Sequence, residues 1–318
     1  MVKKITRRFF YIIGILKGRL KYWSTRPYYL VRSSWPVWYY LLNKEGRRMY
    51  KSYPPFLSEA QKRVVRDLKS NGYALTNLKE LFPDGNLKNQ LELYVKNKMS
   101  TGSVEVKKGK SFLIELWEAI PALDLNHPFV LLGLNEVALN IANGYLDMWS
   151  KLSLLSLHLT VPISANAGPE KSQLWHRDPE DKLMCKMFVY LNDVDENSGP
   201  FMYVAGSHYG GPWRRLAPQR PPKGYYPPRG LVEKVVPPEN IKTFTGPAGT
   251  VIFCDTSGLH KGGYAKSGQR IMFTVGYNSR ASLKPVLYRQ PSSSEGDIAK
   301  LNPMVRYALK NKKYQRPI

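Results

Sequence analysis

Cysteine, acidic residues and long apolar runs are all scarce in this sequence of 318 residues. Its two cysteines, Cys185 and Cys254, lie inside apolar, strand-like runs, which favours reduced core thiols in a reducing compartment, although one disulfide between them stays open. We expect no apolar run to approach the ~18 residues that cross a bilayer. The run that comes nearest to this length, at residues 9–16, is flanked by Lys and Arg. We therefore expect neither a membrane span nor a secretory signal, and a cytoplasmic location.

The acidic residues number 24 against 48 basic ones, and the excess of positive charge is unevenly placed. Residues 1–55 hold 13 Lys or Arg and one Glu, residues 214–243 hold seven against two, and residues 281–318 hold eight against two. The remainder is nearly neutral, with 20 against 19. Charge placed in this way draws a chain to anionic partners such as phospholipid, nucleic acid or a phosphorylated substrate.

These shifts in composition divide the chain into three sections. They are a basic, aromatic N-terminal extension (1–55), a domain (56–280) with a proline-rich insertion (212–243), and a basic C-terminal extension (281–318). The N-terminal extension is interpreted either as an arm for an anionic membrane surface or a partner, or as a segment that packs over the domain. For the insertion, we expect a lid that contacts substrate or a passive loop, and for residues 301–313 a solvated basic helix.

The domain begins with helical patterns and continues with strands. Ser58 to Gln61 has the form of a capping box, and apolar residues follow at helical spacing until Asn71-Gly72. Beyond residue 150 the apolar period becomes that of short strands, at 152–163, 184–191, 201–204, 250–254 and 271–277. We predict an α+β protein that is mainly β, with a jelly-roll core and a helical buttress.

A histidine and a carboxylate two residues apart form the first candidate site. In the segment QLWHRD (173–178), an extended chain sends His176 and Asp178 to the same face, with Cα atoms roughly 7 Å apart. Taken alone, the pair fits a surface histidine beside a salt-bridged aspartate more often than a metal site. His260, in a glycine-rich loop after the strand 250–254, could supply the third ligand of a two-histidine, one-carboxylate site for Fe(II).

An arginine opens the last predicted strand. Arg270, Met272 and Thr274 share one face of the strand 270–277, and Ile271, Phe273 and Val275 share the other. A guanidinium buried in such a strand is costly without an anion, and its planar fork fits a carboxylate through two hydrogen bonds. Arg270 is therefore a candidate carboxylate-binding residue.

Taken together, these segments resemble the phytanoyl-CoA dioxygenase family of Fe(II)- and 2-oxoglutarate-dependent oxygenases. The resemblance covers about residues 57–280 and is carried by LSEAQKRVVRDLKSNGYAL (57–75), WHRD (175–178), LNDVDENSGPFMYVAGSH (191–208), GTVIFCDTSGLH (249–260) and Arg270. It implies a double-stranded β-helix, that is, a jelly roll, in which His176, Asp178 and His260 hold iron. It also implies that Arg270 holds the distal carboxylate of 2-oxoglutarate.

The resemblance further implies a reaction, in which O2 and 2-oxoglutarate are consumed, succinate and CO2 are released and a C–H bond is hydroxylated. We expect a small-molecule or lipid-like substrate, and the sequence does not decide whether that substrate has an acidic group. One alternative is a non-catalytic jelly-roll module that docks on membrane or nucleic acid through its basic arms. Another keeps the chemistry but acts on a macromolecule; nucleic acid is the less favoured partner, and the oligomeric state is open.

The sequence departs from the family pattern at two positions. Gly262 stands where members often have a hydroxyl residue that helps to bind the cosubstrate, and Arg177 stands where many have Gln. Retention of Asp178 favours oxygen transfer over halogenation, because related halogenases have a small residue there. We expect structural roles for the remaining candidate histidines, His127, His158 and His208.

Overall fold

Two antiparallel sheets form the centre of the computed structural model, which describes residues 24–102, 105–107, 109–163, 168–289 and 295–310. The larger sheet has seven strands in the order β1-β8-β5-β10-β4-β3-β2, and the smaller has three in the order β7-β6-β9. The strand bounds are β1 Tyr73–Asn77, β2 Glu105–Val106, β3 Leu113–Glu115, β4 Lys151–Thr160, β5 Met184–Tyr190, β6 Phe201–Val204, β7 Ile241–Phe244, β8 Thr250–Cys254, β9 His260–Gly262 and β10 Arg270–Asn278. This is the predicted jelly-roll arrangement, with the strands beyond residue 150 close to their expected bounds.

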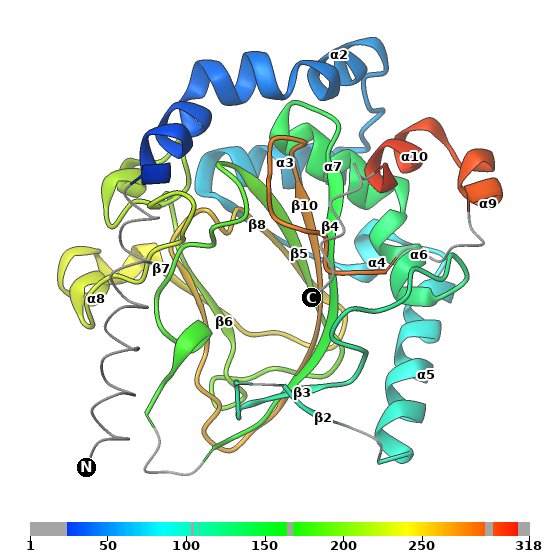
Figure 1. Cartoon of the computed structure of the whole chain (residues 1–318). Coiled ribbons are helices and arrows are strands. Elements are labelled where there is room, and N and C mark those ends of the chain that lie inside the picture. The colour runs from blue at the N-terminus through cyan, green and yellow to red at the C-terminus, as the bar shows by residue number, and fades with distance from the viewer. Residues whose placement is uncertain (1–23, 103–104, 108, 164–167, 290–294, 311–318) are drawn as a thin grey trace, which may run out of the picture.

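Helices cover the side of the large sheet that faces away from the small one (Figure 1). The helix α3 begins after a capping box, in which the Ser58 hydroxyl accepts from the Gln61 backbone N–H, and ends at Gly72 with a φ of 82°. Only glycine adopts such a φ readily, so the predicted start and stop of this helix are both confirmed. The helix bounds are α2 Lys44–Ser52, α3 Glu59–Asn71, α4 Leu78–Leu81, α5 Asn86–Ser100, α6 Pro128–Leu134, α7 Glu136–Leu146, α8 Leu231–Val235, α9 Glu295–Lys300 and α10 Pro303–Leu309.

The two faces of β10 separate the two main clusters of buried side chains. Phe273, Val275 and Tyr277 pack with the helices, whereas Met272 packs with the cluster that lies between the two sheets. This alternation follows from the two-residue period of a strand and agrees with the faces predicted for this segment. Arg270 comes first on the Met272 face and therefore points into the space between the sheets, where it is 3% exposed.

The described part of the N-terminal section packs over the domain. Residues 24–33 are helical, and the π-helix η1 (Pro36–Leu42) follows. The Trp38 side chain in η1 is buried and its indole N–H donates to Asp181 Oδ1 at 2.6 Å, three residues after Asp178. Trp38 therefore packs against the domain as one interpretation expected, whereas several large apolar side chains of the same section stay exposed, so the two interpretations are not separated here. Residues 1–23, including the apolar run 9–16, lie outside the described residues.

Two further expectations need correction. Residues 301–309 are not a solvated tail, because α10 buries Val305, Ala308 and Leu309 in the main core; residues 311–313 lie outside the described residues. Against the expectation from the sequence, residues 128–146 are long and apolar enough, by length and composition, to span a membrane. They form two helices, α6 and α7, that break at Asn135, and they are mostly buried inside the molecule, as core helices are.

Candidate metal centre

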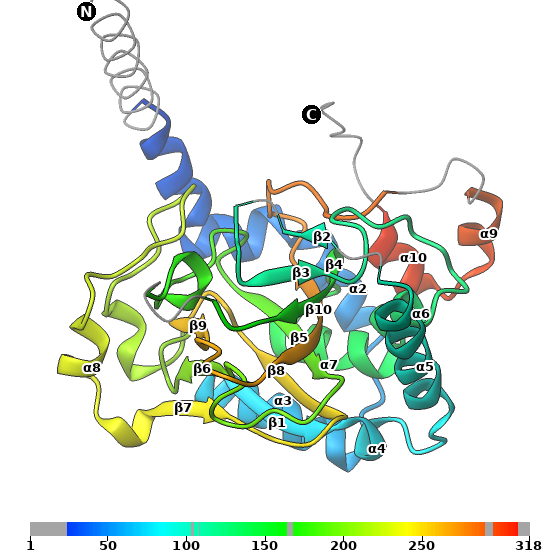
Figure 2. The same cartoon turned by 90° about the horizontal axis from the view of Figure 1, so that it is seen from below.

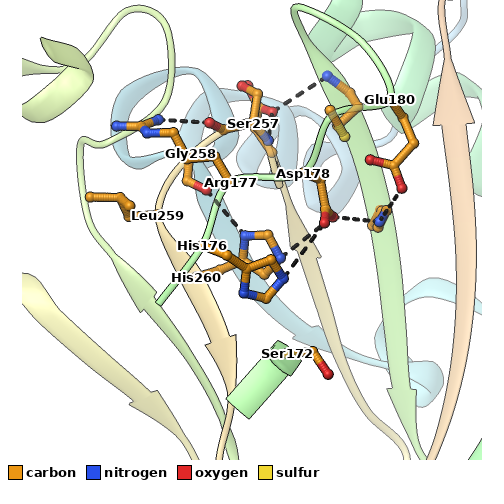
Figure 3. Close-up of polar contacts among 12 residues, drawn as sticks. Ser172, His176, Arg177, Asp178, Glu180, Ser257, Gly258, Leu259 and His260 are labelled. Atoms are coloured by element: carbon orange, nitrogen blue, oxygen red, sulfur yellow. Dashed lines mark hydrogen bonds and ion pairs between the residues drawn. The ribbon is translucent and has the colours of Figure 1, made fainter. Parts of the chain in front are cut away.

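Two histidines and one aspartate converge at the end of the small sheet. His176 and Asp178 lie in the segment before β5, and His260 is the first residue of β9 (Figure 3). His176 and His260 exchange backbone hydrogen bonds of 2.9 and 3.0 Å, and this isolated bridge places their rings side by side, with centroids 4.2 Å apart. One ligand atom from each of the three residues lies within 4.8 Å of the others, so they could hold a metal ion together.

Both imidazoles direct Nε2, the ring nitrogen that can bind a metal here, toward the place where the three ligand atoms meet. His176 Nδ1 lies 2.8 Å from the carbonyl of Leu174, and His260 Nδ1 lies 3.1 Å from the carbonyl of Gly258. Because a carbonyl oxygen can only accept, each Nδ1 carries the proton, and each Nε2 is left with a lone pair directed at Asp178. Burial, and next the neighbouring His260 ring, lower the pKa of His176 to about 3, so this ligand is neutral at physiological pH.

The aspartate is held by a lysine that the sequence interpretation missed. Lys186 Nζ lies 2.6 Å from Asp178 Oδ2 and 3.5 Å from Glu180 Oε1. Burial alone would raise the pKa of Asp178, but the Lys186 ammonium together with His260 and His176 outweighs burial and holds that pKa well below its usual range. Asp178 is thus ionised and oriented by an outer partner, as ligating carboxylates usually are. A lysine in the otherwise apolar run MCKMFVY (184–190) was the available signal.

Arg270 is buried beside the metal candidate without a carboxylate partner among the described residues. Its guanidinium donates to the carbonyl of Gly199 and, at 3.3 Å, to Thr160 Oγ1, while its Nε has no hydrogen-bond partner. Burial lowers the pKa of Arg270, which means that the charged group has lost water without gaining an anion. A buried cation with an unused donor suits the carboxylate of a small anionic ligand.

The residue between His176 and Asp178 has a different role. Arg177 points away from the cluster of His176, Asp178 and His260 and toward Ser257 (Figure 3). It donates to five backbone carbonyls, those of Ser207, Trp213, Leu216, Ala217 and Ser257. Three of these carbonyls belong to the proline-rich insertion, and the Arg177 backbone also bridges to Tyr225. Arg177 therefore ties the insertion to the metal motif and does not reach a cosubstrate.

Gly262 faces Arg270. This is the position at which members of the family that the sequence resembles often have a hydroxyl residue. A Cβ atom at position 262 would lie 3.6 Å from Arg270 Nη2 and 3.5 Å from the Ser172 carbonyl oxygen, both ordinary contacts. Thr160, the strand partner of Arg270, supplies a hydroxyl on the same guanidinium, and the Tyr190 hydroxyl is close enough to shift its pKa. These neighbours come from β4 and β5, and sequence spacing gave no indication of them.

The other histidines lie outside the cluster, as expected. His127 caps α6 by accepting from the Phe129 N–H, and its ring stacks on Trp117 with centroids 4.3 Å apart. His208 Nε2 lies 3.0 Å from the Lys69 carbonyl. His158 Nε2 lies 2.7 Å from Lys107 Nζ, and burial lowers its pKa to about 3. Cys185 and Cys254 are both buried and free.

Comparison with known proteins adds a match to a family model and a likeness in fold. Residues 149–272 match the family model described as phytanoyl-CoA dioxygenase, a range that contains the three clustered residues and Arg270. No curated protein matches the sequence. Among solved structures, the epimerase SnoN, in complex with Fe3+, alpha ketoglutarate and nogalamycin RO, is 16% identical with a TM-score of 0.51 over 69% of this chain and 84% of its own.

EctD from S. alaskensis, solved with 2-oxoglutarate and 5-hydroxyectoine, is 14% identical with a TM-score of 0.49 over 74% of this chain and 88% of its own. At such identities a likeness bears on the fold alone. The SnoN match agrees with the two-sheet arrangement described above, and the assignment of chemistry rests on the family match and on the donor set of the cluster.

Proposed function

We propose that this chain is a dioxygenase of the phytanoyl-CoA dioxygenase family that uses iron, 2-oxoglutarate and O2, and that it hydroxylates a C–H bond of a small-molecule or lipid-like substrate with an anionic group. Support comes from the family-model match over residues 149–272 and from the cluster of metal-binding side chains. One oxygen atom of O2 enters the hydroxyl group. The other enters succinate, which forms with CO2 from 2-oxoglutarate. The observation that carries the proposal is the convergence of two Nε2 lone pairs and an ionised carboxylate near an anion-free buried arginine.

In this proposal, His176, Asp178 and His260 hold the iron, and Arg270 holds the distal carboxylate of 2-oxoglutarate. Iron, when bound, supplies the activation of dioxygen. The carbonyls of Leu174 and Gly258 keep the imidazoles in the ligating tautomer, and Lys186 keeps the Asp178 carboxylate ionised. Tyr226 of the insertion stacks on His176, with ring centroids 5.2 Å apart, and shields that ligand from water.

The test is succinate formation by the purified protein with Fe(II), ascorbate and 2-oxoglutarate, with and without candidate substrates. We expect slow uncoupled turnover in the wild type and none in Asp178→Ala, and a loss of bound iron in the same variant by metal analysis. Lys79→Ala, an exposed lysine on α4, is the control for non-specific effects. Equal succinate formation by wild type and Asp178→Ala would instead favour a non-catalytic docking module.

We also propose that the protein is cytoplasmic and associates peripherally with an anionic membrane surface. Support comes from large apolar side chains that stay exposed on the N-terminal section, namely Tyr28, Leu30 and Val31 on the helix 24–33 and Tyr40 and Leu41 on η1. They lie in a section with 13 cations and one acidic residue. Apolar anchors combined with Lys and Arg are what binding to anionic lipid requires.

Vesicle sedimentation tests this second proposal. We expect the full chain to pellet with phosphatidylcholine vesicles that contain phosphatidylserine, to pellet less as salt rises, and to remain soluble with phosphatidylcholine alone. Val31→Glu combined with Leu41→Glu should weaken the binding several-fold. Binding that is insensitive to both changes would contradict a peripheral membrane location.

A further inference from the structure

A cavity of about 580 Å³ lies beside the metal motif, where the N-terminal section, the insertion and the C-terminal section meet. Its walls come from residues 29–38, 177–182, 207–223 and 281–284, with Ser257. The N-terminal helix and the insertion lie side by side here in both views (Figures 1 and 2). The volume falls in the range of roughly 300–1,000 Å³ that is typical of small-molecule sites.

The lining of this cavity is strongly basic. Besides Arg177, it contains six cationic side chains and two acidic ones, the cations being Arg32, Lys182, Arg214, Arg215, Lys223 and Lys284. Both acidic groups are engaged elsewhere, since Asp181 accepts from Trp38 and from the Ser279 N–H, and Glu180 contacts Lys186. In the described part of the chain, Arg32, Arg214, Arg215 and Lys284 have no ion-pair partner. Their charge is thus available to an anionic ligand.

The same cavity has an apolar and aromatic part. Trp38, Tyr209 and the prolines 218, 221 and 222 line it. Tyr209 is fixed between a stacked Trp35 ring, with centroids 4.9 Å apart, and the Lys182 ammonium at 4.4 Å from its centroid. A fixed aromatic wall favours a flat or apolar portion in the ligand, next to its charged group.

Hydrogen bonds join the cavity wall directly to the metal motif. Gln219, in the insertion, donates to the backbone carbonyls of Asp178 and Asp181, and Arg177 donates to the carbonyls of Leu216 and Ala217. The Glu180 side chain lines the cavity and contacts the same Lys186 ammonium that holds Asp178. The Glu180 side chain in the cavity wall therefore lies two side-chain contacts, through Lys186, from the Asp178 carboxylate.

From this arrangement we infer that the cavity binds the anionic end of the substrate, a phosphate or an equivalent multiply charged group attached to an apolar body. Arg32, Arg214, Arg215 and Lys284 hold the anion, and the wall of Trp38, Tyr209 and prolines holds the apolar body. The identification of the ligand as the substrate rests on the proposed function, whereas anion binding by the cavity does not. The insertion is then a substrate-contacting element of the enzyme.

Calorimetric titration with inorganic pyrophosphate tests the cavity on the full chain. We expect saturable binding that Arg214→Ala combined with Arg215→Ala weakens by about tenfold or more, because charge-assisted hydrogen bonds to phosphate are lost. Both arginines are exposed, so the double variant should melt like the wild type. The control, Arg66→Ala with Lys79→Ala, removes the same charge from exposed positions on α3 and α4 and should bind like the wild type.

A second arm distinguishes a free phosphate compound from a lipid head group. If the wild type binds phosphatidate vesicles but not pyrophosphate, and the double variant binds the vesicles more weakly, the ligand is a lipid head group. If the double variant binds pyrophosphate more weakly than the wild type, the ligand is a soluble phosphate compound. Either outcome supports anion binding by the cavity. Equal affinities of wild type and double variant in both arms would overturn it. Asp178→Ala should still bind pyrophosphate, so wild-type turnover by that variant would refute the proposed function alone.

Discussion

Two buried arginines, one within the metal motif and one at the start of β10, have opposite surroundings. Arg177 and Arg270 are 4% and 3% exposed, and burial lowers the pKa of each. Arg177 donates from all three nitrogens to five carbonyls, whereas Arg270 donates to one carbonyl and one hydroxyl and leaves Nε unpaired. Neither forms an ion pair with a carboxylate in the part of the chain that the structure describes.

The difference separates a structural role from a binding role. A guanidinium whose donors are all used contributes to stability by satisfying carbonyls that the fold buries. A guanidinium with an unused donor and no anion costs free energy in the empty protein, and a bound carboxylate recovers that cost. Arg177 thus stabilises the insertion against the metal motif, and Arg270 retains capacity for a ligand.

The largest effect should come from removing the satisfied arginine. Arg177→Met leaves five carbonyls without their donor, and we expect the free energy of unfolding to fall by about 4 kcal/mol. Urea denaturation monitored by tryptophan fluorescence measures this. Arg177→Lys should recover a small part of the loss, because one ammonium cannot reach carbonyls that are spread along the insertion. A Met variant as stable as the wild type would mean that Arg177 does not hold the insertion.

Removing Arg270, the arginine with an unpaired donor, should weaken ligand binding and leave the stability of the fold unchanged. For Arg270→Met we expect the affinity for 2-oxoglutarate to fall by about 100-fold, as when one partner of a buried charge pair is lost, with no decrease in the free energy of unfolding. Calorimetry with 2-oxoglutarate, together with urea denaturation, checks both halves. If the variant loses stability and keeps its affinity, the roles that we assign to the two arginines are reversed.

An intermediate effect is expected at Lys186, which acts on the metal candidate through Asp178. In Lys186→Met, the Asp178 carboxylate loses the cation that keeps it ionised and oriented, so iron affinity should fall by roughly tenfold. Competition with a chromogenic chelator measures the affinity, and Lys79→Met is the exposed control. Tighter iron binding would show that the ammonium repels the metal more than it orients its ligand.

The smallest effect is expected at Gly262, beside the arginine that we assign to ligand binding. Gly262→Ser places a hydroxyl near Arg270 Nη2 in ordinary contact distance, and we expect the KM for 2-oxoglutarate to fall by about threefold, consistent with one added neutral hydrogen bond. Thermal stability should stay unchanged, because no φ at this position demands glycine. An increase in KM would indicate that the space beside Arg270 is needed for the cosubstrate itself.

The fold could largely be predicted because its signals are local: the capping box at Ser58 and the period of the strands each lie within a few residues. Of the metal site, only the His-x-Asp spacing is local, and the full set with His260 was predicted through the resemblance to a family. The C-terminal helix and the N-terminal section could not be assigned in this way. Their many Lys and Arg residues predicted solvated or membrane-bound segments. Their buried residues, such as Trp38 and Leu309, however, pack against partners more than 100 residues away in the sequence.

The sequence by itself determined the double-sheet core and the His-x-Asp pair, because backbone period and turn chemistry act over short distances; the set of three ligands and the role of Arg270 came through the resemblance to a family. Tertiary structure alone decided that Lys186 holds Asp178, that Arg177 ties down the insertion, and that a basic cavity forms beside them. Those partners come from strands and loops that meet only after folding. Side-chain hydrogen bonds and ion pairs depend on distances in space, and spacing along the chain does not fix these.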